Sequence, residues 1–313
     1  MIKPVLNIND LLIFIKNNKK ITFTNLSEEE NMKNLLHTYN YLNIFSLKYF
    51  FATGTIFDKN SQRTVYSYTC PTKYKHLKKQ YFDLLRFEEK IRNGVLQYEV
   101  ELKTHFIFFL EKFLKNNNLD FETFLNSLKY YDYATKKLKP IKQETIDTLS
   151  KEWERQIEKF SVKKQNFSDY YYLLIKVLSF GTIVNLLNYE YEFSKKNIKK
   201  IFTLFNIYLK KNTKFSIGSK IDDLESIVIL RNSLCHKESL ITFLEKGYKI
   251  DLIKTPKKSF LQLRENAISR IYEYYHLKKG KKKILQNNNW IRNYLNYRLK
   301  NRKGNFKKIK INV

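Results

Sequence analysis

The sequence contains few of the residues that interrupt helices or cross-link chains. Its 313 residues include seven glycines, four prolines and two cysteines. Sparse glycine and proline predict long helices. Cys70 and Cys235 lie far apart in the sequence, without a CxxC spacing, which argues against both a disulfide framework and a zinc site. We therefore expect no metal, no cofactor and a reducing, cytoplasmic setting.

Long apolar runs are also missing. No stretch approaches the ~18 consecutive apolar residues of a membrane span. The apolar segment within residues 1–20 is short and interrupted, and no small-residue cleavage site follows it. We expect a protein that is neither inserted in a membrane nor exported.

Acidic residues are scarce relative to basic ones. There are 30 Asp and Glu against 59 Lys and Arg, a formal charge of +29. Such an excess destabilises a compact chain by self-repulsion and predicts a polyanionic partner, with nucleic acid as the first candidate. An A+T-rich genome would also enrich Lys, but it would enrich Glu as well and would not produce a two-to-one excess.

Apolar residues recur at helical spacing over most of the chain, which predicts an all-α fold. The clearest stripe covers residues 78–117, with Glu99 and Lys103 lying off it. Further helices are expected at 27–50, 142–160, 169–190, 195–211, 221–238 and 259–278. The segment Arg63–Cys70 alternates weakly and is interpreted as an extended loop or a short hairpin arm.

The C-terminal segment Leu277–Val313 contains 13 Lys or Arg and no Asp or Glu. Such a run is commonly a solvated or disordered end, which suits the sequence KKGKKK at 278–283. The alternative is a short RNA-binding helix whose aromatic residues stack on bases while its basic residues follow phosphates. The candidate RNA-binding residues are Lys278, Lys279, Lys281, Lys282, Lys283, Trp290, Arg292, Tyr294 and Arg298.

The candidate catalytic residues lie together in the sequence Arg231-Asn232-Ser-Leu-Cys-His236. Asn232 and His236 are four positions apart, so they share a helix face, and the long Arg231 side chain can bend toward it. Imidazole can act as a general base or acid, and guanidinium can hold phosphate oxygens as negative charge develops. This trio suits RNA cleavage by the 2′-hydroxyl without a metal, although an Arg and a His at this spacing are by themselves a weak signal.

Resemblance to a known family supplies the context for this motif. The sequence RNSLCH has the form R-N-x-x-x-H found in HEPN ribonucleases. The chain resembles the Abi-like family of abortive-infection proteins, the AbiD and AbiF group, in three blocks: 35–50, 81–106, and 174–187 joined to 224–236. The resemblance implies a HEPN helical bundle, RNA cleavage that halts translation in an infected cell, and, as for some AbiF-like members, an associated small noncoding RNA. This chain has Lys176 where the family usually has an acidic residue.

HEPN ribonucleases pair two Arg/His motifs, and this chain has one close match, so the resemblance predicts a homodimer. The alternative pair within one chain, Arg270 and His276, has a looser spacing and is interpreted as a phosphate contact or a helix surface feature. We expect an N-terminal helical region at 1–76, a HEPN helical domain at 77–278 and a basic tail at 279–313.

Two other functions compete with the ribonuclease. One is a non-catalytic RNA-binding protein of the same fold, which senses or sequesters RNA; the change at Lys176 keeps this alternative open. The other is a DNA-binding regulator, but no segment has the pattern of a helix-turn-helix with a short basic recognition helix.

Overall fold

The computed structural model describes residues 7–45, 54–58, 63–68, 70–132, 134–159, 171–194, 197–236, 240, 243 and 260–278. Helices dominate this part of the chain, which confirms the predicted all-α class. The chain divides into two compact units. Unit 1 comprises Met1–Arg92, Ser233–Thr255 and Tyr272–Val313, and unit 2 comprises Asn93–Asn232 and Pro256–Ile271. The domain boundaries expected at 76/77 and 278/279 stay predictions.

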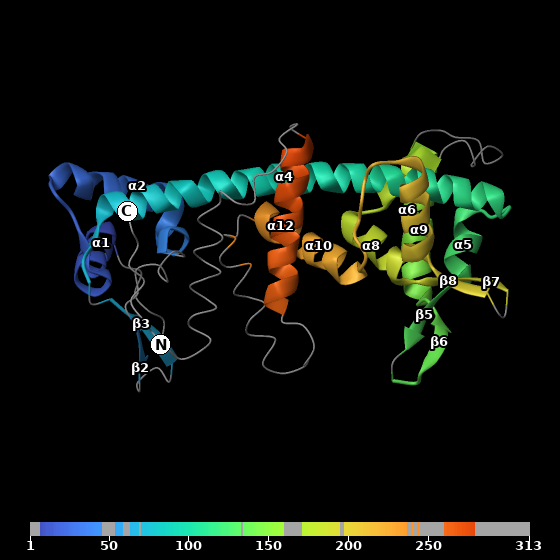
Figure 1. Cartoon of the computed structure of the whole chain (residues 1–313), viewed down its shortest axis with the longest axis horizontal. Coiled ribbons are helices and arrows are strands. Elements are labelled where there is room, and N and C mark those ends of the chain that lie inside the picture. The colour runs from blue at the N-terminus through green and yellow to red at the C-terminus, as the bar shows by residue number, and fades with distance from the viewer. Residues whose placement is uncertain are drawn as a thin grey trace. The chain divides into compact units, whose positions relative to one another are not determined.

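The longest element is α4, Tyr74–Asn116, a helix of 43 residues (Figure 1). It confirms the helix predicted at 78–117. Its first part belongs to unit 1 and its remainder, from Asn93, to unit 2. The predicted apolar stripe is buried along its length, at Leu84, Phe87, Ile91, Val95, Tyr98, Leu102, Phe106, Phe109 and Phe113.

Unit 1 contains two N-terminal helices, α1 (Ile8–Lys19) and α2 (Leu26–Ile44). Strand β1 (Ile21–Thr22) pairs in parallel with β4 (Thr72–Lys73). Strands β2 (Gly54–Asp58) and β3 (Arg63–Ser67) form an antiparallel hairpin. The weak alternation after Arg63 was therefore a correct signal for a hairpin arm.

Unit 2 packs its helices around the second part of α4. They are α5 (Phe121–Ser127), α6 (Gln143–Lys159), α9 (Ile201–Asn212), α10 (Ile221–Cys235) and the first turns of α12 (Phe260–Lys278). The core between α4 and α9 is aromatic: the Phe205 ring lies 5.4 Å from that of Phe106 and 5.3 Å from that of Phe109. Helices expected at 142–160, 221–238 and 259–278 are confirmed within a few residues at their described ends.

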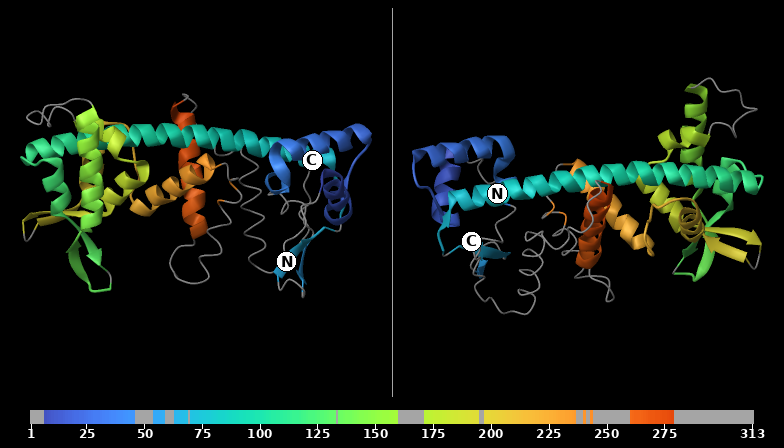
Figure 2. Two further views of the ribbon diagram at one scale, coloured as in Figure 1. Left: turned by 180° about the vertical axis from the view of Figure 1, so that it is seen from behind. Right: turned by 45° about the horizontal axis from the view of Figure 1, so that its top comes forward.

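Unit 2 also contains an antiparallel sheet that the sequence did not predict. Its strand order is β6 (Lys137–Pro140), β5 (Leu128–Asp132), β7 (Glu190–Ser194) and β8 (Asn197–Lys200). Tyr191 of β7 packs edge-on against Phe113 of α4, with ring centroids 5.0 Å apart. The sheet therefore lies at the end of that helix (Figure 2). The helix expected at 195–211 is wrong at its start, because residues 197–200 form β8.

The single helix expected at 169–190 is also wrong. The chain forms α7 (Leu174–Val177), breaks, and continues as α8 (Phe180–Asn188). Ser179 causes the break by capping α8, accepting a hydrogen bond from the Thr182 amide at 3.1 Å. In the described part of the chain no single helix is long and apolar enough to span a membrane; the segments Tyr171–Val177 and Phe180–Asn188 pass that test only together, and they are bent by 108°.

Candidate functional site

Helix α10 positions Arg231 and Asn232 in unit 2. Leu224, Ile227 and Leu230 on its inner face are fully buried, which fixes the rotation of the helix. Arg231 is half-buried, and its Nε donates to Oε2 of Glu99 on α4 at 2.9 Å. Its Nη1 donates to Oδ1 of the exposed Asn232 at 3.2 Å. These two contacts fix the plane of the guanidinium group.

Two residues of α4, Glu99 and Lys103, complete the surroundings of Arg231. They are four residues apart and therefore lie on one side of the helix. Burial lowers the pKa of Lys103; Glu99 opposes this shift, whereas the positive charges of Arg231 and Lys176 add to it. Lys103 thus lies in the field of one carboxylate and two cations. We call Glu99, Lys103, Lys176, Arg231 and Asn232 the Arg231 cluster.

The break between α7 and α8 brings Lys176 to this cluster. Gly181, in the first turn of α8, has no side chain, and a Cβ there would lie 3.8 Å from the Val228 side chain of α10. Within the Leu-Ser-Phe-Gly sequence the serine therefore begins α8, and the glycine lies where α8 faces α10. Lys176, on α7 just before this sequence, is exposed.

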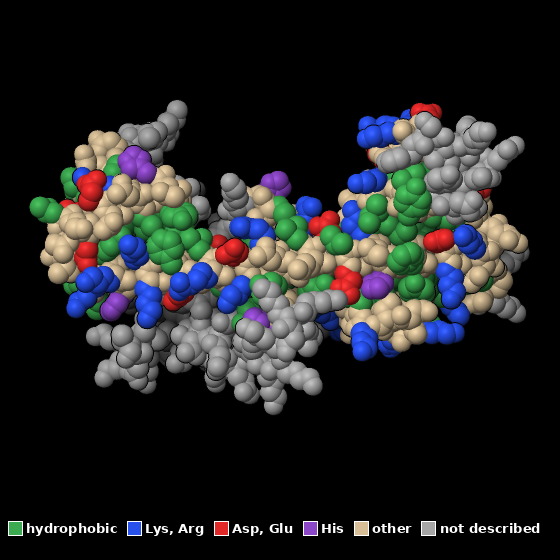
Figure 3. Space-filling view, turned by 90° about the horizontal axis from the view of Figure 1, so that it is seen from above, with side chains coloured by type: hydrophobic (Ala, Val, Ile, Leu, Met, Phe, Trp, Pro, Cys, Tyr) green, Lys and Arg blue, Asp and Glu red, His purple; other side chains and the backbone are tan. Residues whose placement is uncertain are grey.

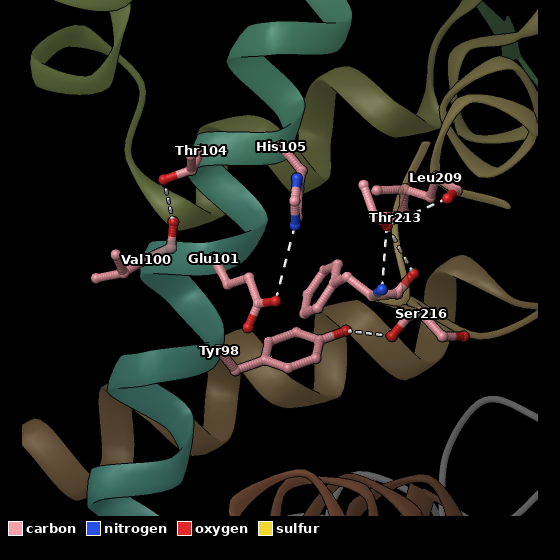
Figure 4. Close-up of polar contacts among 9 residues, drawn as sticks. Tyr98, Val100, Glu101, Thr104, His105, Leu209, Thr213 and Ser216 are labelled. Atoms are coloured by element: carbon pink, nitrogen blue, oxygen red, sulfur yellow. Dashed lines mark hydrogen bonds and ion pairs between the residues drawn. The ribbon is translucent and has the colours of Figure 1, made fainter. Parts of the chain in front are cut away.

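The loop that leads into α10 is tied to α4. Tyr98 donates a long hydrogen bond, 3.5 Å, to the Ser216 carbonyl (Figure 4). The Thr213 hydroxyl donates to the Leu209 carbonyl at 3.1 Å and accepts from the Phe215 amide at 3.0 Å. The start of α10 is therefore held in a defined position.

Arg270 of α12 also holds this loop. Its Nη1 donates to the Ile217 carbonyl at 2.9 Å and lies 3.6 Å from Oδ2 of Asp223. Gly218 has a φ of 83°, and the guanidinium group occupies the space that a Cβ would need. Arg270 thus has a structural role in unit 2.

His276 lies in unit 1 and is 9% exposed, so its interpretation as a helix surface feature was wrong. Its ring packs against those of Tyr272 and Tyr275, with centroids 4.3 and 5.4 Å away. Burial among aromatic rings makes it an interior residue.

The third predicted catalytic residue, His236, follows α10 in a turn and is exposed. It belongs to unit 1, whereas Arg231 and Asn232 belong to unit 2. Lys278 is the last residue of α12, and its side chain is not described. The other predicted RNA-binding residues lie outside the described residues: Lys279, Lys281, Lys282, Lys283, Trp290, Arg292, Tyr294 and Arg298.

Metal-ligating side chains do not gather in the described ranges: no group of three or more His, Cys, Asp or Glu there is arranged to hold an ion. The acidic member of the Arg231 cluster, Glu99, instead binds the guanidinium group.

A comparison with protein families gives a match to the Abi-like protein family over residues 34–242, well over half of the chain. The chain belongs to the Abi-like protein family. No curated protein and no solved structure matches it significantly. The matched region of this Abi-like protein contains α4, α7, α8 and α10, and hence every residue of the Arg231 cluster.

Sequence reasoning missed Glu99 and Lys103 as members of the site of this Abi-like protein. Their signal was an acidic and a basic residue four positions apart, beside the apolar stripe of a long helix. This pattern occurs on many solvated helices. Only the contact between α4 and α10 shows which carboxylate meets Arg231.

Proposed function

We propose that this Abi-like protein is a metal-independent HEPN endoribonuclease of the AbiD/AbiF type, acting as a toxin in bacterial antiviral defence. Its family supports a role in abortive infection. The observation that carries the proposed chemistry is the Arg231 cluster. There the guanidinium group on α10 is oriented by Glu99 and Asn232, and Lys103 of α4 and Lys176 of α7 add their positive charges. Three cations and one carboxylate favour the binding of an anion such as a phosphodiester.

The proposed reaction uses a nucleophile that RNA itself provides. An imidazole takes the proton of the 2′-hydroxyl, whose oxygen attacks the adjacent phosphorus. The bond from phosphorus to the 5′-oxygen breaks, and a second imidazole gives that oxygen a proton. The products are a 2′,3′-cyclic phosphate and a 5′-hydroxyl. His236 of each of two protomers supplies the imidazoles, and Arg231 stabilises the negative charge on the phosphate oxygens.

Lys103 and Lys176 add positive charge for the same phosphate. The lowered pKa of Lys103 reflects partial burial, where a charge interacts more strongly with a ligand than it does in water. Glu99 keeps Arg231 from rotating toward solvent and compensates part of the repulsion among the cations. We expect Glu99 to be a positioning residue, because it contacts the guanidinium group.

The homodimer is part of this proposal, because one chain supplies one close match to the motif. Exposed apolar side chains on α4 and α10 support it. Leu96 and Val100 flank Glu99 in sequence and are 39% and 61% exposed, and Ile229, one turn before Asn232, is 42% exposed. A second copy of the chain would cover these side chains and bring its own Arg231 and His236.

A bound small noncoding RNA is the second proposed partner. The net charge of +29 exceeds what one cleavage site requires. The segment after Lys278, which includes Trp290 and Tyr294, is the proposed contact for this RNA. Purification followed by nuclease treatment and sequencing of the released RNA would identify it.

The decisive experiment is an RNA cleavage assay with purified protein in excess EDTA. We expect wild-type protein to cut RNA and to leave 2′,3′-cyclic phosphate ends. His236→Ala should reduce the rate by about 10²-fold to 10⁴-fold, as expected for loss of a general acid or base. His37→Ala, at an exposed histidine of α2, is the matched control and should leave the rate unchanged. Equal and negligible cleavage by wild type and His236→Ala would refute the ribonuclease.

A non-catalytic RNA-binding protein is the second candidate function, and Lys176 is the observation that favours it. A third cation in the cluster strengthens phosphate binding, while the acidic residue usual in the family is missing at this position. High-affinity RNA binding without cleavage in any divalent-ion condition would support this candidate over the ribonuclease.

A further inference from the structure

The segment from β8 to the start of α10, residues 197–220, contains six lysines and no acidic residue. All six lysines are exposed, and in the described part of the chain none of them forms an ion pair. The six are Lys199, Lys200, Lys210, Lys211, Lys214 and Lys220. Like charges gathered without ion pairs repel one another, so a polyanion that bound this surface would stabilise it.

Helix α9 carries two of these lysines on its outer side, and two more lie just beyond its ends. Its inner side is buried against α4 through Phe205 and Leu209, which are 0% and 1% exposed. The outer side begins at Lys200 and continues through Thr203 and Ile207, both exposed, at spacings of three or four residues. Lys210 and Lys211 lie in the last turn of the helix, and Lys214 follows its end. We call Lys200, Lys210, Lys211 and Lys214 the lysine ridge.

Helix α6 of the same unit shows that this arrangement is not a general result of lysine-rich composition. Its 17 residues carry Lys151, Arg155 and Lys159 among five acidic residues, and Arg155 pairs with Glu152 at 3.0 Å. A bias that merely adds lysine to exposed helices would give α9 the same mixture. Residues 197–220, in contrast to α6, contain basic residues and no acidic ones. The face drawn in Figure 3 also shows more Lys and Arg than Asp and Glu on the described surface.

The lysine ridge has the dimensions of a short nucleic-acid strand. From Lys200 to Lys211 the helix rises roughly 16 Å, which matches about five nucleotides of a stacked strand at 3.4 Å each. Lysine is a mobile point charge without the planar fork of arginine, so it suits contact with successive phosphates and not base recognition.

The ridge is connected to the Arg231 cluster by ordered chain. The Asn206 side chain of α9 donates to the Gly218 carbonyl at 3.2 Å, and Arg270 holds Ile217. Lys220 directly precedes α10, and Arg231 lies eleven residues further, roughly 16 Å along the helix axis. The positive charge of the ridge therefore continues through Lys214 and Lys220 to the helix that carries Arg231.

We propose that the lysine ridge binds the phosphate backbone of RNA, independently of sequence, and leads the strand toward the Arg231 cluster. This inference rests on the proposed function for the identity of the polyanion. It assigns substrate capture to folded residues of unit 2, in addition to the basic C-terminal segment.

The test compares two triple charge reversals of equal size in full-length His236→Ala protein, so that no cleavage is needed. The ridge variant is Lys200→Glu, Lys211→Glu and Lys214→Glu. The control variant is Lys142→Glu, Lys151→Glu and Lys159→Glu, at exposed lysines in or next to α6. Fluorescence anisotropy measures the binding of a labelled single-stranded RNA between about 50 and 300 mM salt, where counterion release dominates. Circular dichroism melting checks that each variant is folded.

We expect the ridge variant to lose at least about tenfold in RNA affinity near 100 mM salt. The slope of log K against log salt concentration should fall by about two, because each lost contact with a single strand removes about 0.7. The control variant should lose less than about threefold with an unchanged slope, and Lys→Arg at the three ridge positions should retain binding.

If the ridge and control variants lost RNA affinity equally, the loss would be explained by net charge alone, and the proposal would be overturned. Unchanged RNA binding by the ridge variant would also overturn the proposal. If that variant instead lost binding to vesicles of anionic phospholipid, the ridge would be assigned to a membrane surface. Because binding is measured without cleavage, a protein that binds RNA through the ridge but never cuts it would refute the ribonuclease and leave this inference standing.

Discussion

The Arg231 cluster and the lysine ridge are both basic, but their charges are held in different ways. In the cluster, Arg231 is half-buried and fixed by Glu99 and Asn232, and burial lowers the pKa of Lys103. On the ridge, the lysines are exposed and have no ion pair among the described residues. A fixed charge suits chemistry at one phosphate, whereas mobile charges suit attachment to many phosphates. Substitutions in the cluster should therefore change the cleavage rate, and substitutions on the ridge should change RNA affinity.

Among the substitutions that test this comparison, the largest effect is expected for Arg231→Lys, which keeps the charge but removes the planar fork. The lysine cannot reproduce the contacts with Glu99 and Asn232 together with a bidentate hold on phosphate. The cleavage rate should fall by about 10²-fold to 10³-fold, while RNA affinity changes by less than about threefold. Single-turnover kinetics measures the rate, and Arg155→Lys on α6 is the control. A fall in affinity as large as the fall in rate would abolish the distinction between cluster and ridge.

The proposed dependence of the cluster on a second protomer is tested by Ile229→Glu. A carboxylate buried at an interface should weaken dimerisation by about 10²-fold. Cleavage should fall with the dimer, while binding through the ridge of each monomer persists. Light scattering coupled to size-exclusion chromatography measures the mass, with Ile13→Glu on α1, 55% exposed, as the control. A variant that remains dimeric and active would contradict the predicted interface.

Glu88 is a buried carboxylate in unit 1 that, unlike Glu99, has no guanidinium group bound to it among the contacts described above. It accepts a hydrogen bond from the Leu240 amide at 2.7 Å, yet burial raises its pKa to about 7, an effect that this bond and Arg92 oppose. The folded state therefore binds a proton more tightly than the unfolded state does. The stabilisation is complete below about pH 4.5 and is lost as the pH rises to about 7.

Over that range, Glu88 should remove about 3 kcal/mol from the free energy of unfolding, or about 10²-fold in the folding constant. Glu88→Gln should abolish this part of the pH dependence. Urea unfolding at several pH values measures it, with Glu89→Gln, at an exposed neighbour, as the control. Identical pH profiles for wild type and Glu88→Gln would show that Glu88 titrates normally.

The positioning role of Glu99 is tested by Glu99→Gln. The amide keeps the shape but loses the charge-assisted hydrogen bond that orients Arg231. We expect about a tenfold fall in kcat with little change in KM, and a further fall in the pKa of Lys103, because Glu99 raises it. Glu101→Gln, at a half-buried residue of the same helix beside His105, is the matched control. An effect confined to KM would assign Glu99 to substrate binding.

The smallest effect is expected for Lys176→Glu, which restores an acidic residue at the position where the family usually has one. Removing this exposed cation should lower RNA affinity by about threefold and raise the pKa of Lys103, shifting the pH profile of cleavage upward. Lys136→Glu, in the exposed β5–β6 turn, controls for net charge. An increase in the cleavage rate would mean that the acidic residue assists the reaction and that Lys176 weakens it.

The sequence predicted the long helices well, because an apolar stripe as continuous as that of α4 can be buried on one side only if the segment is a helix. It missed the sheet because β5 to β8 are short and rich in Lys and Tyr. The two hairpins they form are joined by the pairing of β5 with β7, about 60 positions apart, which no local pattern reveals. The break at Ser179 was missed because apolar residues continue through it. Arg231 was found from its motif, but Glu99 was not, since their contact joins residues 132 positions apart.

Gly218 is a position in the loop where any side chain would be strained, because its φ is 83° and the Arg270 guanidinium group occupies the space of a Cβ. A methyl group there would displace the guanidinium group from the Ile217 carbonyl and from Asp223, in the first turn of α10. The helix that carries Arg231 would then lose these contacts with α12. A single added carbon atom in the loop would in this way disturb the position of the helix segment that carries Arg231 and Asn232.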